Sequence, residues 1–146
     1  MSAKKILLPL VAEFIPAGFP SPAENYIDTS IDLNEELIRN PSSTFFLRVQ
    51  GESMSNAGIL DGDLLIIDRS ISPQPGHIVV AVLNGSFTLK RFAYRKNIPY
   101  LEAAHPNYSA IDLRHYESVQ IWGVAIHAIH SLNRTTRHKN NAYSAN

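Results

Sequence analysis

The sequence of 146 residues has the length of one ordinary domain with room for a sizeable apolar core. Its 13 basic and 13 acidic residues give a formal net charge of zero, which excludes a general electrostatic attraction to nucleic acid or anionic lipid. There is no cysteine, so disulfide bonds and thiolate metal sites are excluded, and a reducing cytoplasm is the expected setting. No apolar run is long enough to predict a membrane-spanning helix.

The first 25 residues are predicted to form an extended, exposed arm. The stretch "IPAGFPSPAENY" (15–26) holds three prolines and a glycine among small residues, a composition that favours neither helix nor sheet. An extended and exposed segment is what a protease needs in its substrate. The residues before it superficially resemble a secretory signal, but Pro9, Glu13 and Pro16 interrupt the apolar run, so we do not interpret them as one.

One short helix is predicted next, in "IDLNEELIRNP" (31–41). Asp32 is suited to cap its N-terminus, and Glu35 stands three residues later, as in a capping box. Apolar residues follow at helical spacing, and Asn40-Pro41 ends the pattern.

The rest of the chain is predicted to be mainly β. Six segments have strand character: "TFFLRV" (44–49), "DLLIID" (63–68), "HIVVAVL" (77–83), "SFTLKRFAY" (86–94), "PYLEAA" (99–104) and "VQIWGVAIHAI" (119–129). The pair Asn84-Gly85 predicts a two-residue hairpin turn. Because "HIVVAVL" is apolar at both parities, we expect it to be covered on both faces, in a folded-over, barrel-like sheet. Residues 133–146 are polar, and no structure is predicted for them.

Ser53, in "GESM" (51–54), and Lys90, in the apolar strand 86–94, are the candidate catalytic residues. A serine hydroxyl needs a base, and lysine can serve if its pKa falls by roughly three units from about 10.4, through burial or a nearby cation such as Arg91. Thr88 lies on the same strand face as Lys90 and could orient the neutral amine. Gly51 would let the backbone turn tightly and aim N–H groups at a carbonyl oxygen.

These residues alone leave a plain structural interpretation open. A serine after a glycine is usually a turn residue, and a lysine in a strand is usually a solvated edge residue. His127 and His130 stand three apart, which on a strand places them on opposite faces, so no metal site is predicted. Asp61 and Asp63 flank a glycine and predict a turn. We expect neither a metal nor a cofactor.

A resemblance decides between these interpretations. The motifs "GESM", "DGDLLIID" and "FTLKRF" at this spacing resemble the LexA/UmuD self-cleaving Ser-Lys peptidase family (S24-type). The segment "AGFPSPAENYIDTSIDLNEELIRNPSSTFFLRVQGESM" resembles the UmuD branch, and the 17 residues before Gly18 are too few for the three-helix DNA-binding domain of a LexA repressor. The resemblance implies that Ser53 is the nucleophile and Lys90 the general base. It also implies cleavage between Ala17 and Gly18, with the backbone N–H groups of Glu52 and Ser53 as oxyanion donors; the best-known UmuD protein has a cysteine in place of the alanine.

The same resemblance implies a biological role. On DNA damage, a RecA filament on single-stranded DNA would stimulate self-cleavage in the bacterial cytoplasm. The shortened homodimer would then act as a regulatory subunit of an error-prone, UmuC-type translesion DNA polymerase in SOS mutagenesis. Neither sequence-specific DNA binding nor membrane attachment is expected. Residues 1–25 would be the cleavable arm and linker, 26–132 the peptidase domain and 133–146 a polar tail.

Two alternatives remain open from the sequence. The chain could be a non-catalytic polymerase-binding scaffold with a vestigial dyad. A signal peptidase uses the same Ser-Lys chemistry but needs a membrane anchor, which the sequence does not predict.

Trp122 is expected on a late edge strand. It is a candidate residue for anchoring a partner protein, and packing in the core is the alternative.

Overall fold

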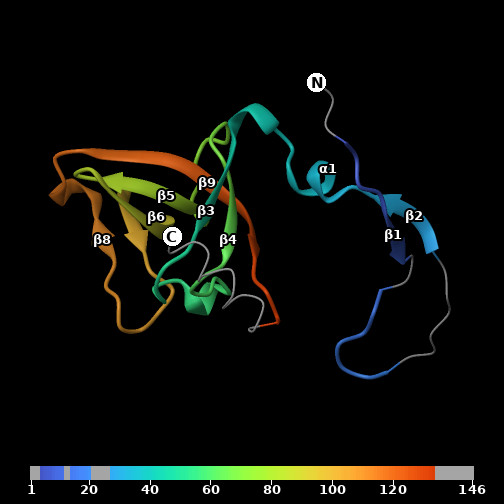
Figure 1. Ribbon diagram of the computed structural model, residues 1–146. Coiled ribbons are helices and arrows are strands. Elements are labelled where there is room, and N and C mark those ends of the chain that lie inside the picture. Colours follow the sequence, from blue (N-terminus) through green and yellow to red (C-terminus); the bar gives the residue numbers. More distant parts are fainter. Residues whose placement is uncertain (1–3, 12–13, 21–26, 134–146) are drawn as a thin grey trace, which may run out of the picture. The chain divides into compact units, whose positions relative to one another are not determined.

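The computed structural model describes residues 4–11, 14–20 and 27–133 (Figure 1). The chain divides into two compact units, residues 1–41 and 42–146. In the first unit, strand β1 (Leu8–Val11) pairs antiparallel with β2 (Ile27–Ile31). The sequence analysis predicted neither strand, and β2 lies outside the predicted arm of residues 1–25. The predicted polar tail, apart from its first residue, lies outside the described residues.

The predicted short helix is confirmed as α1 (Leu33–Leu37). The side chain of Asp32 caps it by accepting a hydrogen bond from the backbone N–H of Asn34 at 3.0 Å. Residues 14–20, which include Ala17 and Gly18, are exposed and have neither helix nor strand structure, as the proline-rich sequence predicts. None of the described helices is long and apolar enough to cross a membrane.

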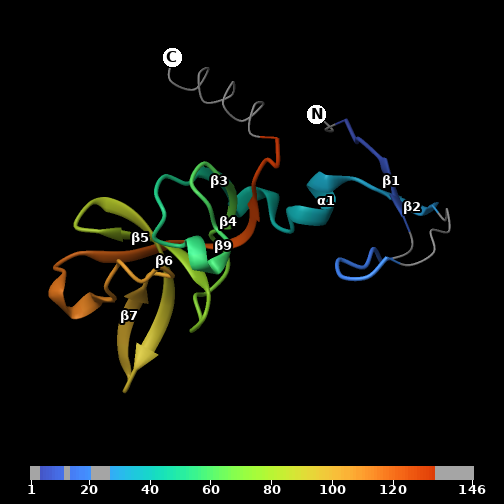
Figure 2. The same cartoon turned by 90° about the horizontal axis from the view of Figure 1, so that it is seen from below.

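The second unit is one antiparallel sheet of seven strands in the order β3-β4-β9-β5-β6-β7-β8 (Figures 1 and 2). Six of the strands match the six predicted segments. The strands are β3 (Thr44–Arg48), β4 (Leu64–Asp68), β5 (Ile78–Leu83), β6 (Ser86–Arg95), β7 (Ile98–Glu102), β8 (Ile111–Asp112) and β9 (Val119–Ile129). Only the two-residue β8 was not predicted, because so short a segment has no periodicity to detect.

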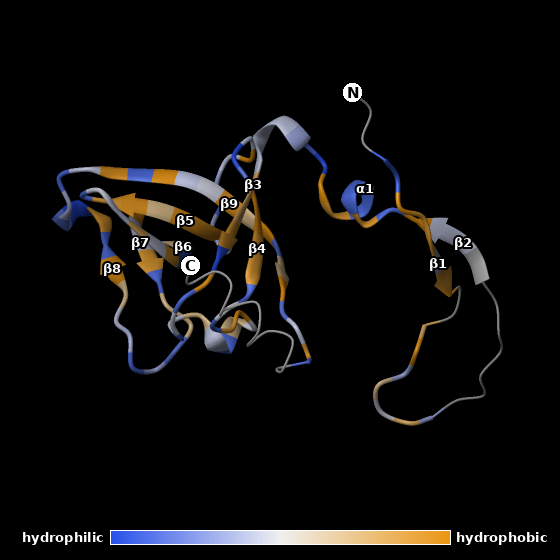
Figure 3. Cartoon of the chain, viewed as in Figure 1, coloured by the Kyte–Doolittle hydropathy of each residue, from blue (hydrophilic) through white to orange (hydrophobic). Residues whose placement is uncertain are grey.

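Strand β5 is buried on both faces, as its apolar sequence predicts. Val79, Ala81 and Leu83 belong to one core cluster, and Val80 belongs to a second cluster that includes Met54. The alternation follows from the two-residue period of a strand. Figure 3 shows β4 and β5 as hydrophobic along most of their length. The two faces of β5 therefore pack into two separate apolar cores.

The prediction that Trp122 lies on an edge strand is wrong. Strand β9 lies between β4 and β5, near the centre of the sheet. The register against β5 shifts between Gly123 and Ile121, so Trp122 is the extra residue of a β-bulge. Its ring is 5.1 Å from that of Phe45 and is partly buried against the second core cluster. Core packing, the alternative interpretation, therefore describes Trp122 better than an edge anchor does.

Two tight hairpins place β6 between β5 and β7. The predicted turn at Asn84-Gly85 is confirmed, with φ values of 48° and 86°. The turn at Lys96-Asn97 has φ values of 51° and 65° and was not predicted, because lysine is uncommon in the left-handed region. Between these turns β6 runs for ten residues, with Lys90 near its middle.

Candidate active site

Ser53 lies in the turn that follows β3. Beyond β3, the N–H of Val49 donates to the carbonyl oxygen of Asp63 at 2.9 Å, so this chain segment stays attached to the start of β4. The chain then turns at Gly51, which has a φ of 96° in the left-handed region that glycine adopts easily. This turn brings Ser53 out of the sheet and is the geometry expected from the "GESM" motif.

Lys90 reaches Ser53 from the middle of β6. Its Nζ lies 3.1 Å from Ser53 Oγ, 3.0 Å from Thr88 Oγ1 and 3.1 Å from the carbonyl oxygen of Leu89. Only 8% of Lys90 is exposed. The structure therefore brings together two residues that stand 37 positions apart, and Thr88 contacts the amine as its position on the strand predicted.

Burial lowers the pKa of the Lys90 amine, because the charged form loses hydration. The sequence analysis allowed either burial or the neighbouring Arg91 as the cause, and burial is the one that applies. A neutral amine has two N–H donors and one lone pair. If the donors bind the Leu89 carbonyl and the Thr88 hydroxyl, the lone pair remains for the Ser53 hydroxyl. The arrangement can therefore take a proton from the serine.

The dyad opens into a cleft of about 340 Å³. Residues 47–51 line one side of the cleft and residues 87–90 of β6 line another, together with Ser53, Met54, Leu65 and Val80. Strands β3 and β6 are separated by three strands in the sheet order, so the sheet must fold over to bring them to one cleft. This is the folded-over sheet that the sequence predicts.

Both strand walls of the cleft have an unpaired edge among the described residues. Strand β3 pairs only with β4, and the first half of β6 pairs only with β5, because β7 begins its pairing at Arg91. Unpaired strand edges offer backbone hydrogen bonds to an extended peptide. The cleft is thus suited to a substrate without regular structure.

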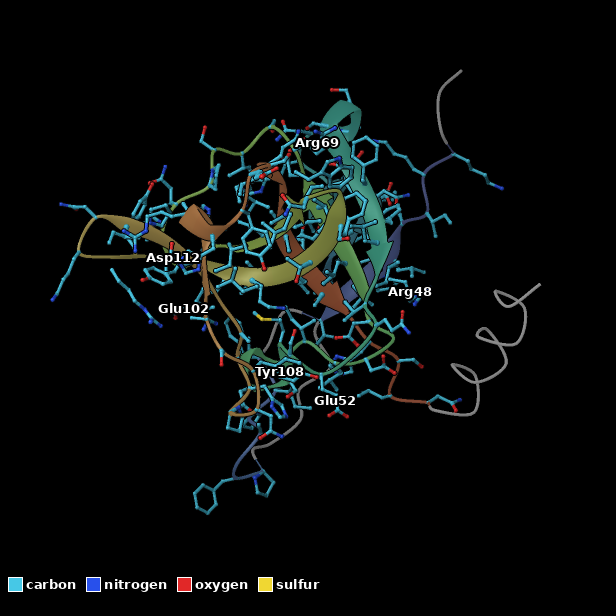
Figure 4. All side chains as sticks on the ribbon, turned by 90° about the vertical axis from the view of Figure 1, so that its left-hand side faces the viewer. Arg48, Glu52, Arg69, Glu102, Tyr108 and Asp112 are labelled. Atoms are coloured by element: carbon cyan, nitrogen blue, oxygen red, sulfur yellow. The ribbon has the colours of Figure 1, made fainter. Side chains whose placement is uncertain are left out.

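Three hydrogen bonds that the sequence analysis did not predict hold the turn that carries Ser53. After the serine, the N–H of Ala104 donates to the Ser53 carbonyl oxygen at 2.7 Å, and the N–H of Asn56 donates to the Ala104 carbonyl oxygen at 2.8 Å. Before it, the N–H of Gly51 donates to Asp61 Oδ1 at 2.8 Å. Figure 4 shows Glu52 and Tyr108 at the same end of the unit, which agrees with these contacts between the turn and the loop after β7.

The N–H groups of Glu52 and Ser53 have no hydrogen-bond acceptor within the described part of the chain. They lie between Gly51 and the 3-10 helix η2 (Ser55–Ala57). Unpaired backbone donors next to a nucleophile are suited to bind a negatively charged oxygen.

The chain is similar in sequence to known proteins. The family described as Peptidase S24-like matches residues 9–126. Protein ImpA of Salmonella typhimurium is 45% identical to this chain over 124 residues, which cover 84% of this chain and 83% of that protein. Protein MucA of Escherichia coli is 43% identical over 124 residues, 84% of each. The LexA repressor of Shewanella sediminis is 38% identical over 130 residues, 88% of this chain and 62% of the repressor. The chain belongs to the Peptidase S24-like family.

Proposed function

We propose that this chain is a serine endopeptidase that cuts its own N-terminal arm between Ala17 and Gly18. Ser53 is the nucleophile and Lys90 is the general base. The observation that carries the proposal is the 3.1 Å contact between Ser53 Oγ and the buried Nζ of Lys90, in a cleft bordered by unpaired strand edges. The exposed, irregular residues 14–20 supply a segment that such a cleft can bind.

The chemistry follows from the groups in the site. Neutral Lys90 accepts the proton of the Ser53 hydroxyl as Oγ attacks the carbonyl carbon of Ala17. The N–H groups of Glu52 and Ser53 stabilise the resulting oxyanion. The protonated lysine then donates its proton to the nitrogen of Gly18 as the peptide bond breaks. Water hydrolyses the remaining ester, with Lys90 again acting as the base, and releases residues 1–17.

Self-cleavage suits a substrate that is part of the enzyme's own chain. Tethering raises the local concentration of the arm and removes much of the entropic cost of bringing the two reacting groups together. The reaction happens once per chain, so its timing depends on docking of the arm and no turnover is needed. A factor that favours docking could therefore control cleavage.

We propose the biological role that the UmuD-like sequence implies. A RecA filament on single-stranded DNA stimulates the cut in the bacterial cytoplasm during the SOS response. The shortened homodimer then acts as a regulatory subunit of an error-prone, UmuC-type translesion polymerase. The identity with the proteins ImpA and MucA over most of their length supports this role. In this proposal residues 1–25 are the arm and linker, 26–132 the peptidase domain and 133–146 the tail.

The test is the mass of the purified chain after incubation at alkaline pH. We expect loss of residues 1–17 from the wild-type chain and an unchanged mass for Ser53→Ala. A wild-type chain that stays intact, both alone and with RecA filaments, would contradict self-cleavage and favour the scaffold with a vestigial dyad.

A further inference from the structure

Asp61 contacts the segment that carries the nucleophile, although it lies in a different turn. It stands two residues before Asp63, the residue that precedes β4. Its Oδ1 accepts the backbone N–H of Gly51 at 2.8 Å. Within the described residues, this is the one hydrogen bond from a side chain to the backbone of residues 49–53. Asp61 is therefore the side chain that fixes the backbone of this segment.

Gly51 is the residue whose conformation sets the direction of the serine turn. Its φ of 96° is in the left-handed region, and the two unpaired N–H groups of Glu52 and Ser53 follow it directly. On the β3 side, the backbone bond of Val49 to Asp63 holds the segment, and on the far side the Ala104 N–H holds the Ser53 carbonyl. Between these two anchor points, the Asp61 side chain holds the backbone N–H of Gly51.

The loss of this attachment would free the turn at its most flexible residue. Glycine has more accessible backbone conformations than any other residue, so a glycine without a fixed N–H can rotate the following peptide groups. A displacement of about 1 Å at a reacting group can lower a catalysed rate by about a hundredfold.

We propose that Asp61 is a positioning residue for self-cleavage. Its carboxylate fixes Gly51, and so directs Ser53 Oγ towards Lys90 and the N–H groups of Glu52 and Ser53 towards the substrate carbonyl. Among the described residues Asp61 forms no hydrogen bond with the side chains of Ser53 or Lys90, so it acts through Gly51 and not on the reacting atoms. This inference rests on the proposed peptidase function.

The test compares three substitutions of Asp61 in the full chain by the rate of arm release against pH. Asp61→Ala removes the acceptor, and we expect the rate at alkaline plateau to fall between about tenfold and a hundredfold. Asp61→Asn keeps an acceptor at the same length and should stay close to the wild-type rate. Asp61→Glu keeps the charge but is one methylene longer, so it should lie between Asn and Ala.

A matched control tests whether the loss of any carboxylate that accepts a backbone N–H lowers the rate of arm release. Asp112 also accepts a backbone N–H, that of Arg114 at 2.9 Å, and it lies in β8, outside the residues that line the cleft. Asp112→Ala should leave the rate unchanged. Hydrogen exchange should also be faster in the peptide covering residues 49–60 of Asp61→Ala, and close to wild type in Asp61→Asn.

Several outcomes would overturn the inference. An Asp61→Ala chain that cuts at the wild-type rate would do so directly. A Glu variant that cuts faster than the Asn variant would show that charge and not position matters, and this comparison stands even if Asp61→Ala fails to fold. A shifted midpoint of the pH profile would mean that Asp61 acts on the pKa of Lys90. If the wild-type chain itself does not cut, the proposed function fails first, which is a separate result.

Discussion

Thr88 and Lys90 stand two residues apart on β6, and the hydroxyl of the first lies 3.0 Å from the amine of the second. The strand period places both side chains on one face, so a rigid backbone fixes the direction of the lysine. Replacing Thr88 with Val keeps its shape but removes the hydroxyl. We expect self-cleavage to slow by about tenfold, in the range of one lost hydrogen bond of about 1 to 1.5 kcal/mol. Thr88→Ser should restore most of the rate measured by arm release, and equal rates for all three chains would contradict this role.

The dyad itself makes a stricter prediction. Ser53→Ala removes the proposed nucleophile and Lys90→Ala removes the proposed base, so each should abolish arm release. Neither should change the circular dichroism spectrum, because the cores around Val79 and Val80 do not depend on these side chains. Mass spectrometry after prolonged alkaline incubation measures the release. Arm loss from either variant at the wild-type rate would show that the dyad is assigned wrongly.

The pH dependence follows from the direction of the Lys90 pKa. Burial lowers this pKa below its ordinary value of 10.5, so the neutral amine forms at a lower pH than in free lysine. The cleavage rate should rise with pH and level off before pH 10.5. A rate that is flat or falls across this range would exclude lysine deprotonation as the controlling step.

The same lowered pKa affects folding stability. Because burying the protonated amine is unfavourable, the free energy of unfolding increases as pH rises from the lowered pKa towards 10.5, the ordinary value.

The cleavage site gives a prediction of product identity. We expect the new N-terminus to read "GFPSPAENY", beginning at Gly18. Gly18→Glu should block the cut, because a long charged side chain would have to enter the cleft next to the oxyanion donors. Sequencing of the product tests the first statement and the mass of the variant tests the second. A product that begins elsewhere would move the proposed site.

The shortened chain should carry the biological output without the dyad. A chain that begins at Gly18 and also carries Ser53→Ala has nothing left to cut. It should form a homodimer, measured by light scattering, and should co-purify with a UmuC-type polymerase. A monomer, or a dimer that does not bind the polymerase, would contradict the regulatory-subunit role and leave the peptidase proposal standing alone.

Local patterns in the sequence were sufficient for much of the fold. The two-face apolar pattern of β5 and the Asn84-Gly85 turn each depend on neighbouring residues, and both predictions are confirmed. The position of β9 depends on pairing between distant segments, which no local pattern contains. For this reason Trp122 was placed on an edge, although β9 is a central strand.

The candidate site also has features that the sequence could predict and features that only the structure shows. The side-chain chemistry of Ser53, Lys90 and Thr88 made them candidates, and the resemblance to the LexA/UmuD family decided between the catalytic and the structural interpretation. Ala104 contributes a backbone N–H, which every residue except proline has, so its contact with the serine turn leaves no trace in residue type. Asp61 was interpreted as part of a turn, and only the structure adds that its carboxylate binds Gly51.

The place of β9 in the sheet also determines when, during synthesis of the chain, Ser53 and Lys90 can come together. Ser53 follows β3, which pairs with β4, whereas Lys90 belongs to the β5–β6 hairpin. Strand β9 pairs with both β4 and β5 and so joins these two parts of the sheet. Among the described strands it is also the last in chain order. A nascent chain that ends before residue 119 contains both Ser53 and Lys90 but lacks the strand that connects their supports. In the proposed mechanism, a chain translated only as far as residue 118 therefore cannot yet cut between Ala17 and Gly18, because the supports of Ser53 and Lys90 are not joined.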